Sequence, residues 1–144
     1  MLQTWRDIQI IITAFGGVIG GFLGGIDGFM YTLIAFVVID YVTGIMCAIV
    51  EKNLDSEVGA RGIFKKVLIF LLVGIANLID VNVIGTGAIL RTAVIFFYLS
   101  NEGVSILENA GRLGLPIPSK LRAVLAQLRD DAEGEQEDGE NADD

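Results

Sequence analysis

Two groups of polar side chains interrupt stretches of sequence that are otherwise apolar. Asp40 is the single charged residue among the 22 residues of 29–50. The second group recurs at helical spacing and consists of Arg91, Tyr98, Glu102, Ser105 and Asn109. At about 100° per residue these five lie within roughly 60° of a helix circumference, with Asn101 at the edge of the same face. They predict one polar face along a helix.

Polar groups of this kind need partners if the surrounding helices lie in a membrane. An ionised carboxylate in the hydrocarbon costs at least ~2.5 kcal/mol, and lipid offers no hydrogen bonds. Asp40 and Glu102 cannot neutralise each other, so each requires a donor, water or a proton. For Arg91 we expect Asp80 as the partner. Two interpretations stay open: hydrogen-bonded packing inside a closed bundle, or the lining of an aqueous path formed by several copies.

The residue types argue against catalysis. The chain has no histidine, and Cys47 is its only cysteine. No histidine or thiol base accompanies Ser100 or Ser105, and no phosphate-binding glycine loop follows a strand. A disulfide within the chain and a thiol-rich metal site are excluded. We therefore expect no enzyme activity, no catalytic residue, no metal and no cofactor.

The elements that position these side chains are predicted to be membrane-spanning helices. The 144 residues are 53% hydrophobic, with a mean hydropathy of +0.62, which is unusually apolar for a soluble domain of this size. A helix of about 20 apolar residues crosses a bilayer. Four segments approach that length, and they cover residues 8–26, 29–50, 63–80 and 88–108. We predict an all-α integral membrane protein with a transmembrane domain over residues 1–111.

The distribution of basic residues predicts the orientation of these spans. Arg6 precedes the first span, four bases lie in the polar loop 51–66, and four more follow the fourth span. The connections around Asp27 and over 81–87 contain no lysine or arginine. Four spans with both termini in the cytoplasm fit every one of these positions. Three spans would place one of the basic termini outside.

Small residues predict where helices approach one another closely. In the first span, glycines recur every four residues in two adjacent rows, Gly16, Gly20 and Gly24 beside Gly17, Gly21 and Gly25. Glycine costs roughly 1 kcal/mol per residue in a helix, so such rows favour close packing of another backbone. In the second span, Gly44 and Ala48 share the face of Asp40, with Thr43 and Cys47 beside them. This face is expected to be a seam between helices.

The C-terminal part is predicted to lie outside the membrane. Pro116 and Pro118 interrupt any helix, and Ser119 can cap a short amphipathic one within residues 112–129. Its apolar stripe consists of Leu121, Val124, Leu125 and Leu128. Residues 130–144 hold nine of the 18 acidic residues and no base, and are expected to be disordered. No basic patch for nucleic acid is present.

Four blocks in one order resemble the phage holin family that includes toxin-secretion holins. They are IDYVTG at 39–44, SEVGARGIFKK at 56–66, NEGVSILEN at 101–109 and GLPIP at 114–118. The resemblance covers roughly residues 27 to 128. It implies a small protein that oligomerises in the bacterial cytoplasmic membrane and makes lesions that release an endolysin or a toxin. It also implies that Asp40, Tyr41, Thr43, Gly44, Asn101, Glu102, Ser105, Glu108 and Asn109 are signature positions, without assigning them roles.

The sequence therefore favours a holin whose partners are further copies of itself, the lipid bilayer and a functionally coupled endolysin or toxin. The glycines and Ala48 would pack neighbouring helices. Asp40, Thr43 and the polar face of the fourth span, including Asn101, would line the lesion. Two alternatives stay open: a small non-lytic ion or solute channel or transporter component, and a non-conducting membrane adaptor.

Overall fold

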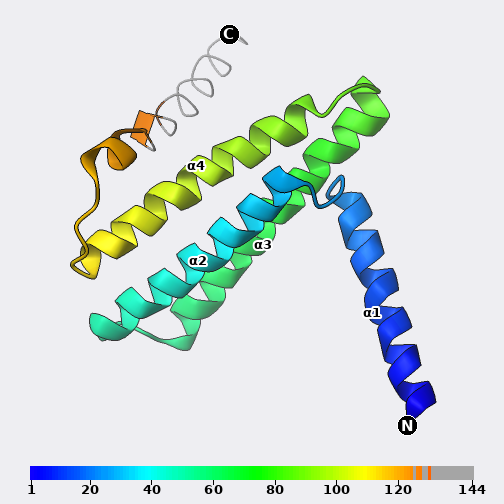
Figure 1. The fold of residues 1–144 in the computed structure, drawn as a ribbon, viewed down its shortest axis with the longest axis horizontal. Helices are drawn as coiled ribbons and strands as arrows, with labels where there is room; N and C mark the ends of the chain where they lie inside the picture. Colours follow the sequence, from blue (N-terminus) through cyan, green and yellow to red (C-terminus); the bar gives the residue numbers. More distant parts are fainter. Residues whose placement is uncertain (125, 128–129, 131–144) are drawn as a thin grey trace.

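The computed structural model describes residues 1–124, 126, 127 and 130, and this part of the chain contains helices and no strand. The elements in chain order are α1 (Leu2–Phe22), α2 (Gly28–Val50), α3 (Ser56–Ile79), the π-helix η1 (Asp80–Ile84) and α4 (Ile89–Arg112). The all-helical prediction is confirmed. Figure 1 shows that α2, α3 and α4 lie side by side, whereas α1 meets them only at its C-terminal end and points away along the rest of its length.

Two of the helical stretches are long and apolar enough to cross a membrane. They are Gly28–Val50, which is α2, and Ser56–Ile84, which joins α3 to η1. α1 and α4 are less apolar, because α1 carries charges near its start and α4 carries the polar face. The spans predicted for 8–26 and 88–108 therefore stay predictions. Their boundaries also differ from the structure. α1 begins at Leu2 and ends at Phe22, and α4 continues to Arg112.

The polar loop predicted over 51–66 is wrong for most of its length. α2 ends at Val50 and α3 already begins at Ser56, so the connection is short. Asp55 caps α3, because its Oδ1 accepts a hydrogen bond from the Val58 N–H at 2.7 Å. Capping of this kind satisfies a backbone donor that has no partner within the helix. The hydrophilic residues that follow therefore belong to the first turns of α3.

The core lies between α2, α3 and α4, with one contribution from the end of α1. Its buried apolar members are Leu23, Met30, Leu33, Val37, Ile69, Val73 and Ile95. α1 itself contributes no buried residue. It touches the core through Phe22, whose ring packs on Gly74 of α3 so closely that a Cβ there would lie 1.9 Å from Cε1. Glycine at this position therefore lets the end of α1 pack on the bundle.

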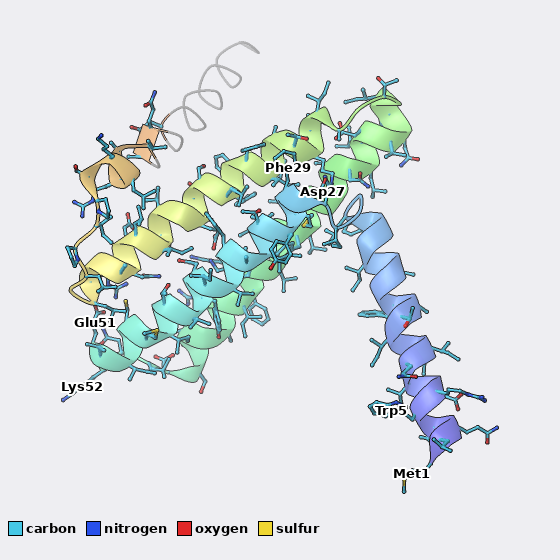
Figure 2. The ribbon with its side chains drawn as sticks, viewed as in Figure 1. Met1, Trp5, Asp27, Phe29, Glu51 and Lys52 are labelled. Carbon is cyan, nitrogen blue, oxygen red and sulfur yellow. The ribbon has the colours of Figure 1, made fainter. Side chains whose placement is uncertain are left out.

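The two glycine rows are shorter than the sequence predicts. α1 ends at Phe22, and Gly24 and Gly25 form the turn to α2 with φ of +81° and +93°. Glycine adopts this left-handed conformation without the steric cost that other residues meet. The helical part of the rows consists of Gly16, Gly17, Gly20 and Gly21, and a Cβ at any of these would meet nothing within 4 Å. Figure 2 shows α1, with Met1 and Trp5 near its far end, standing clear of the other helices.

The C-terminal segment is helical over residues 119–124. Leu121 and Val124 of the predicted apolar stripe are exposed there. Leu125 and Leu128 of the same stripe lie outside the described residues, as do residues 131–144 of the predicted acidic tail. Arg112, at the end of α4, meets Glu51 at the end of α2, so these two helix ends lie together.

Candidate functional site

The polar face of α4 points into the bundle. Arg91, Glu102 and Asn109 are buried, with exposed fractions of 4%, 7% and 6%. Tyr98, Asn101 and Ser105 are half-buried on the same helix. The three buried side chains bond to other parts of the same chain, as the closed-bundle interpretation of the sequence expects. They belong to two clusters, one in the middle of the bundle and one at the corner between α1 and α2.

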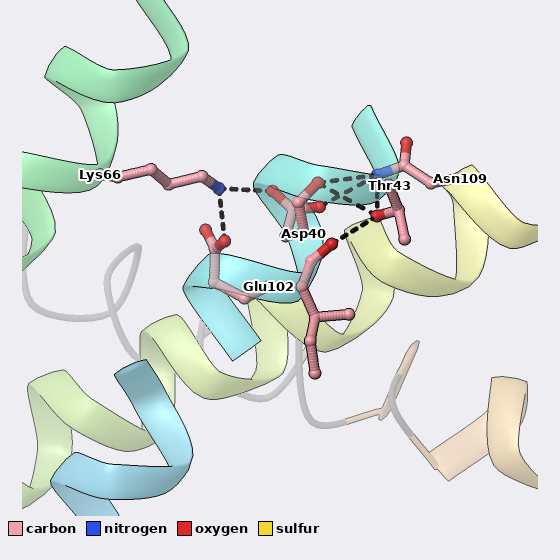
Figure 3. A network of polar contacts seen from close by, with 6 residues as sticks. Asp40, Thr43, Lys66, Glu102 and Asn109 are labelled. Carbon is pink, nitrogen blue, oxygen red and sulfur yellow. Dashed lines mark hydrogen bonds and ion pairs between the residues drawn. The ribbon is translucent and has the colours of Figure 1, made fainter. Parts of the chain in front are cut away.

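The central cluster joins three helices through one ammonium group. Lys66 of α3 donates hydrogen bonds to Asp40 Oδ2 of α2 and to Glu102 Oε2 of α4, and both contacts are ion pairs. The side chains of Asp40 and Glu102 are 10% and 9% exposed, and that of Lys66 is 18% exposed. Figure 3 shows Lys66 reaching both carboxylates from the side opposite Asn109. The cluster therefore ties α2, α3 and α4 together.

Asn109 extends this cluster toward the end of α4. Its Nδ2 donates to Asp40 Oδ1 at 3.2 Å and to Thr43 Oγ1 at 3.0 Å. The Thr43 hydroxyl in turn donates to the Ile39 carbonyl at 2.8 Å. Cys47, which is 1% exposed, donates to the Asn109 carbonyl at 3.3 Å. The predicted seam of α2 thus lies against the predicted polar face of α4.

The remaining seam residues pack at the same interface. A Cβ on Gly44 would lie 3.8 Å from Asn109 Nδ2, and Ala48 is half-buried. Tyr41, from the same motif, points to α3 and donates its hydroxyl to the Gly59 carbonyl at 3.3 Å. The small residues of α2 therefore face α4 within one chain, whereas the helical glycines of α1 face open space.

Lys66 is the functional residue that the sequence reasoning missed. In the sequence it counts among the bases of the polar loop 51–66, although the third predicted span, 63–80, also contains it. Its spacing to Ile69, Val73 and Ala76 is 3, 7 and 10 residues, and these three are buried on one face of α3. Helical continuation of that face would have placed Lys66 inside the bundle. The donor that Asp40 and Glu102 each require is therefore a single shared lysine.

The second cluster is centred on Arg91 and lies at the corner between α1 and α2. Its Nε donates to the Leu23 carbonyl at 2.7 Å, and its Nη2 donates to the Gly25 carbonyl at 2.8 Å. Its Nη1 donates to Asp27 Oδ2 at 2.8 Å, which forms an ion pair. Asn77 Nδ2 of α3 adds a bond to the Phe22 carbonyl at 3.2 Å. The turn that follows α1 is therefore fixed to α3 and α4.

The predicted pairing of Arg91 with Asp80 is wrong for the side chain. Asp80 is 1% exposed, and its two oxygens accept hydrogen bonds from the backbone N–H groups of Leu90 and Arg91. It thereby satisfies donors of the first turn of α4, which have no partner within that helix. The Arg91 guanidinium pairs instead with Asp27, because the turn after α1 places Asp27, at the start of α2, beside it.

Two acidic groups outside the apolar stretches are held in their ionised forms. The hydrogen bond from Arg91 lowers the pKa of Asp27, and the bond from the Met30 N–H lowers it further. At the other end of the bundle, Arg112 Nε donates to Glu51 Oε1 at 3.0 Å. This bond lowers the pKa of Glu51 and raises the pKa of Arg112.

The arrangement is closed and internally satisfied. Among the described residues, every fully buried side-chain nitrogen or oxygen has a hydrogen-bonding partner. The same residues contain no cluster of three or more histidine, cysteine, aspartate or glutamate side chains arranged to hold a metal ion.

Comparison with known proteins connects this bundle to one family. The model of a bacteriophage holin family matches residues 17–130. An uncharacterized protein of Listeria innocua is 39% identical over 136 residues, covering 94% of this chain and 96% of the relative. An uncharacterized 14.9 kDa protein of Clostridium perfringens is 40% identical over 118 residues, covering 81% and 89%. A probable holin of Bacillus phage phi105 is 34% identical over 105 residues, covering 73% and 77%. No solved structure matches the chain.

Proposed function

The chain belongs to the bacteriophage holin family, and we propose that it acts as a holin. In this proposal it accumulates in the bacterial cytoplasmic membrane, oligomerises and permeabilises that membrane. The lesion releases an endolysin or a toxin, and the host lyses. The observation that carries the proposal is the family match, which includes both polar clusters. The two apolar stretches Gly28–Val50 and Ser56–Ile84 support a place in the membrane.

We extend the proposal to four spans with both termini in the cytoplasm. The basic residues of the sequence support this topology by their positions. The geometry is compatible with it, because the end of α2, the start of α3 and the end of α4 share one end of the bundle. The base-free corner at Asp27 and the turn at Gly85 share the other end. α1 and α4 would then be the additional spans.

The buried polar face of α4 supports a closed state that precedes the lesion. With Glu102 and Asn109 bonded to α2 and α3, a single chain has few polar side chains to present to lipid. In the proposed open state, neighbouring copies repack and this face turns to water, which replaces the lost hydrogen bonds. Such exchange costs little net energy, because a hydrogen bond to protein and one to water differ by only ~1 kcal/mol.

The helical glycines of α1 are proposed as the contact between copies. Gly16, Gly17, Gly20 and Gly21 have open space above them in one chain, so another backbone can approach closely. This separates the role of α1 from that of Gly44 and Ala48, which pack within the chain. Gly24 and Gly25 serve the turn, so they fall outside the proposed contact.

Inducible expression in a bacterial host tests the proposal. We expect collapse of the membrane potential after a delay, and lysis when an endolysin is expressed with the chain. Gly20→Leu should strongly delay or abolish this collapse, because the added side chain blocks close approach of another copy, while its Cβ meets nothing within 4 Å in its own chain. Phe15→Leu is the control, because Phe15 is exposed on the face of α1 opposite to the glycines. An unchanged potential on wild-type expression would refute the holin function.

The charged central cluster favours a second candidate function, a small non-lytic ion channel. Lys66 with Asp40 and Glu102 forms a group of charges inside an apolar bundle, which is a feature of ion and proton pathways. Reconstitution in liposomes distinguishes the two candidates. A channel gives selective, saturable ion flux and retains a folded enzyme inside the vesicle. A holin lesion lets the enzyme pass.

A further inference from the structure

The central cluster has an odd number of charges. Asp40 and Glu102 each bring one negative charge when ionised, and Lys66 brings one positive charge. α2, α3 and α4 each contribute one of the three, and no further ion pair reaches them from the described residues. The fully ionised cluster would therefore carry a net charge of −1. An uncompensated charge in the interior of a membrane bundle is unfavourable, and binding of one proton removes it.

The hydrogen bonds identify which carboxylate takes the proton. Asp40 receives Lys66 on one oxygen and Asn109 on the other, so both of its oxygens already accept hydrogen bonds from protein donors. Glu102 receives Lys66 alone among the donors of the described residues. Its side chain is 9% exposed, so water contributes little. We propose that Glu102 binds one exchangeable proton at neutral pH, which makes this cluster a proton-binding site.

The proton connects this site to the packing of α4. With Glu102 protonated, the cluster is neutral and α4 stays against α2 and α3. Release of the proton to water leaves a negative charge between the helices, which favours separation of α4 and entry of water. This consequence rests on the proposed holin function, in which α4 turns its polar face to water. The proton site itself requires no second copy, because all three charges belong to one chain.

Infrared spectroscopy tests the site directly, because a protonated carboxylic acid has a C=O stretching band that an ionised carboxylate lacks. The full chain is reconstituted at pH 7 in vesicles of ether-linked phospholipid, which have no ester carbonyl. Carboxyl groups in water, including those of the acidic C-terminal segment, are ionised at this pH. We expect a band equivalent to one protonated carboxyl per chain. Carbon-13 labelling of glutamate should shift it, and labelling of aspartate should leave it in place.

Substitutions then test the charge count. Glu102→Gln should abolish the band. Asp40→Asn should abolish it too, because the charges of Lys66 and of ionised Glu102 then sum to zero. Lys66→Met should double it, because both carboxylates must then be neutral. Glu57→Gln is the control, since Glu57 is exposed and paired with Arg61, and it should change nothing.

Three results would overturn the proposal: no band in the wild-type chain, a band that survives Glu102→Gln, or a band that survives Asp40→Asn. A band that shifts on labelling of aspartate would overturn the assignment to Glu102. If Lys66→Met fails to fold, the other two substitutions decide. Failure of the holin function is separate, because the band would persist in a chain whose expression leaves the membrane potential intact.

Discussion

Replacement of Asp27 by asparagine isolates the charge of the Arg91 cluster. The Asp27 side chain caps α2 through a bond from the Met30 N–H at 2.9 Å and also pairs with the guanidinium. Asparagine caps a helix about as well as aspartate, so Asp27→Asn keeps the cap and removes the charge. The guanidinium is then left 5% exposed with two carbonyl acceptors and no counter-charge.

The expected loss follows from the burial of the two partners. Breaking a fully buried ion pair costs about 3–5 kcal/mol, whereas an exposed pair contributes about 0–1 kcal/mol. Arg91 is buried but the Asp27 side chain is 46% exposed, so solvent screens part of the interaction. We therefore expect Asp27→Asn to lower the free energy of unfolding by ~1–2 kcal/mol. Asp27→Ala should lose about 1 kcal/mol more, because it also removes the cap.

Asp55 provides the matched control for this experiment. It caps α3 through the Val58 N–H and has no arginine partner among the described residues, so Asp55→Asn should change the stability by about 0 kcal/mol. Reversible unfolding of the purified chain in mixed micelles measures all the variants. A difference below ~0.5 kcal/mol between Asp27→Asn and Asp55→Asn would refute the reasoning. So would a double-mutant cycle of Asp27→Asn with Arg91→Gln whose coupling energy falls below the same value.

The pKa of Asp27 gives the same pair a pH dependence with a defined sign. The Arg91 bond holds the folded-state pKa below the ordinary value of 3.8. Its stabilising contribution is therefore complete above pH 3.8 and is lost as the pH falls through the lower, folded-state pKa. The wild-type chain and Asp27→Asn should converge in stability in that acidic range. A difference in the free energy of unfolding between the two chains that stays constant down to the lowest pH would contradict the ion pair.

Three further predictions use other contacts. Gly74→Ala forces the new Cβ into the Phe22 ring and should cost ~1–3 kcal/mol in unfolding measurements, with Phe22→Leu restoring part of it. Cys47, 1% exposed, should resist a water-soluble maleimide before lysis and react once α4 separates; early labelling would contradict the closed bundle. Glu51→Gln should leave the unfolding midpoint at pH 7 unchanged, because the Arg112 pair is exposed; a clear decrease would show that the pair holds α2 to α4.

The sequence predicts those parts of the site that depend on helical spacing within one segment. The seam of Asp40, Thr43 and Gly44 and the polar face from Arg91 to Asn109 each follow from a repeat of three or four residues, and the structure places them against each other. Partners that come from different helices do not follow from spacing. The pairing of Arg91 with Asp27 depends on how the α1–α2 turn folds back, which one sequence does not determine.

Boundaries between helix and loop were the other source of error, and they changed the chemistry. The hydrophilic residues between 51 and 66 predict a loop, since a run of charges is typical of one. Asp55 caps α3 at the start of this run, so Lys66 belongs to α3 and is half-buried, with its ammonium between two carboxylates. At the end of α1, the four-residue spacing predicts that Gly24 and Gly25 are helical, whereas both have positive φ values and form the turn. Tertiary contacts with Arg91 and Asn77 determine that turn.

The two polar clusters matter more in this bundle than they would in a soluble one. Apolar side chains gain little by leaving lipid for another helix, so polar contacts and close packing hold membrane helices together. Arg91 and Glu102 are 11 residues apart on α4, which places the clusters about 16 Å apart along its axis. Breaking the central cluster alone would remove the buried polar contacts of the second half of α4, leaving the exposed Arg112–Glu51 pair at that end, while Arg91 still holds the corner. In the proposed open state we therefore expect the polar face from Tyr98 to Asn109 to separate from α2 and α3 before the Arg91 end does.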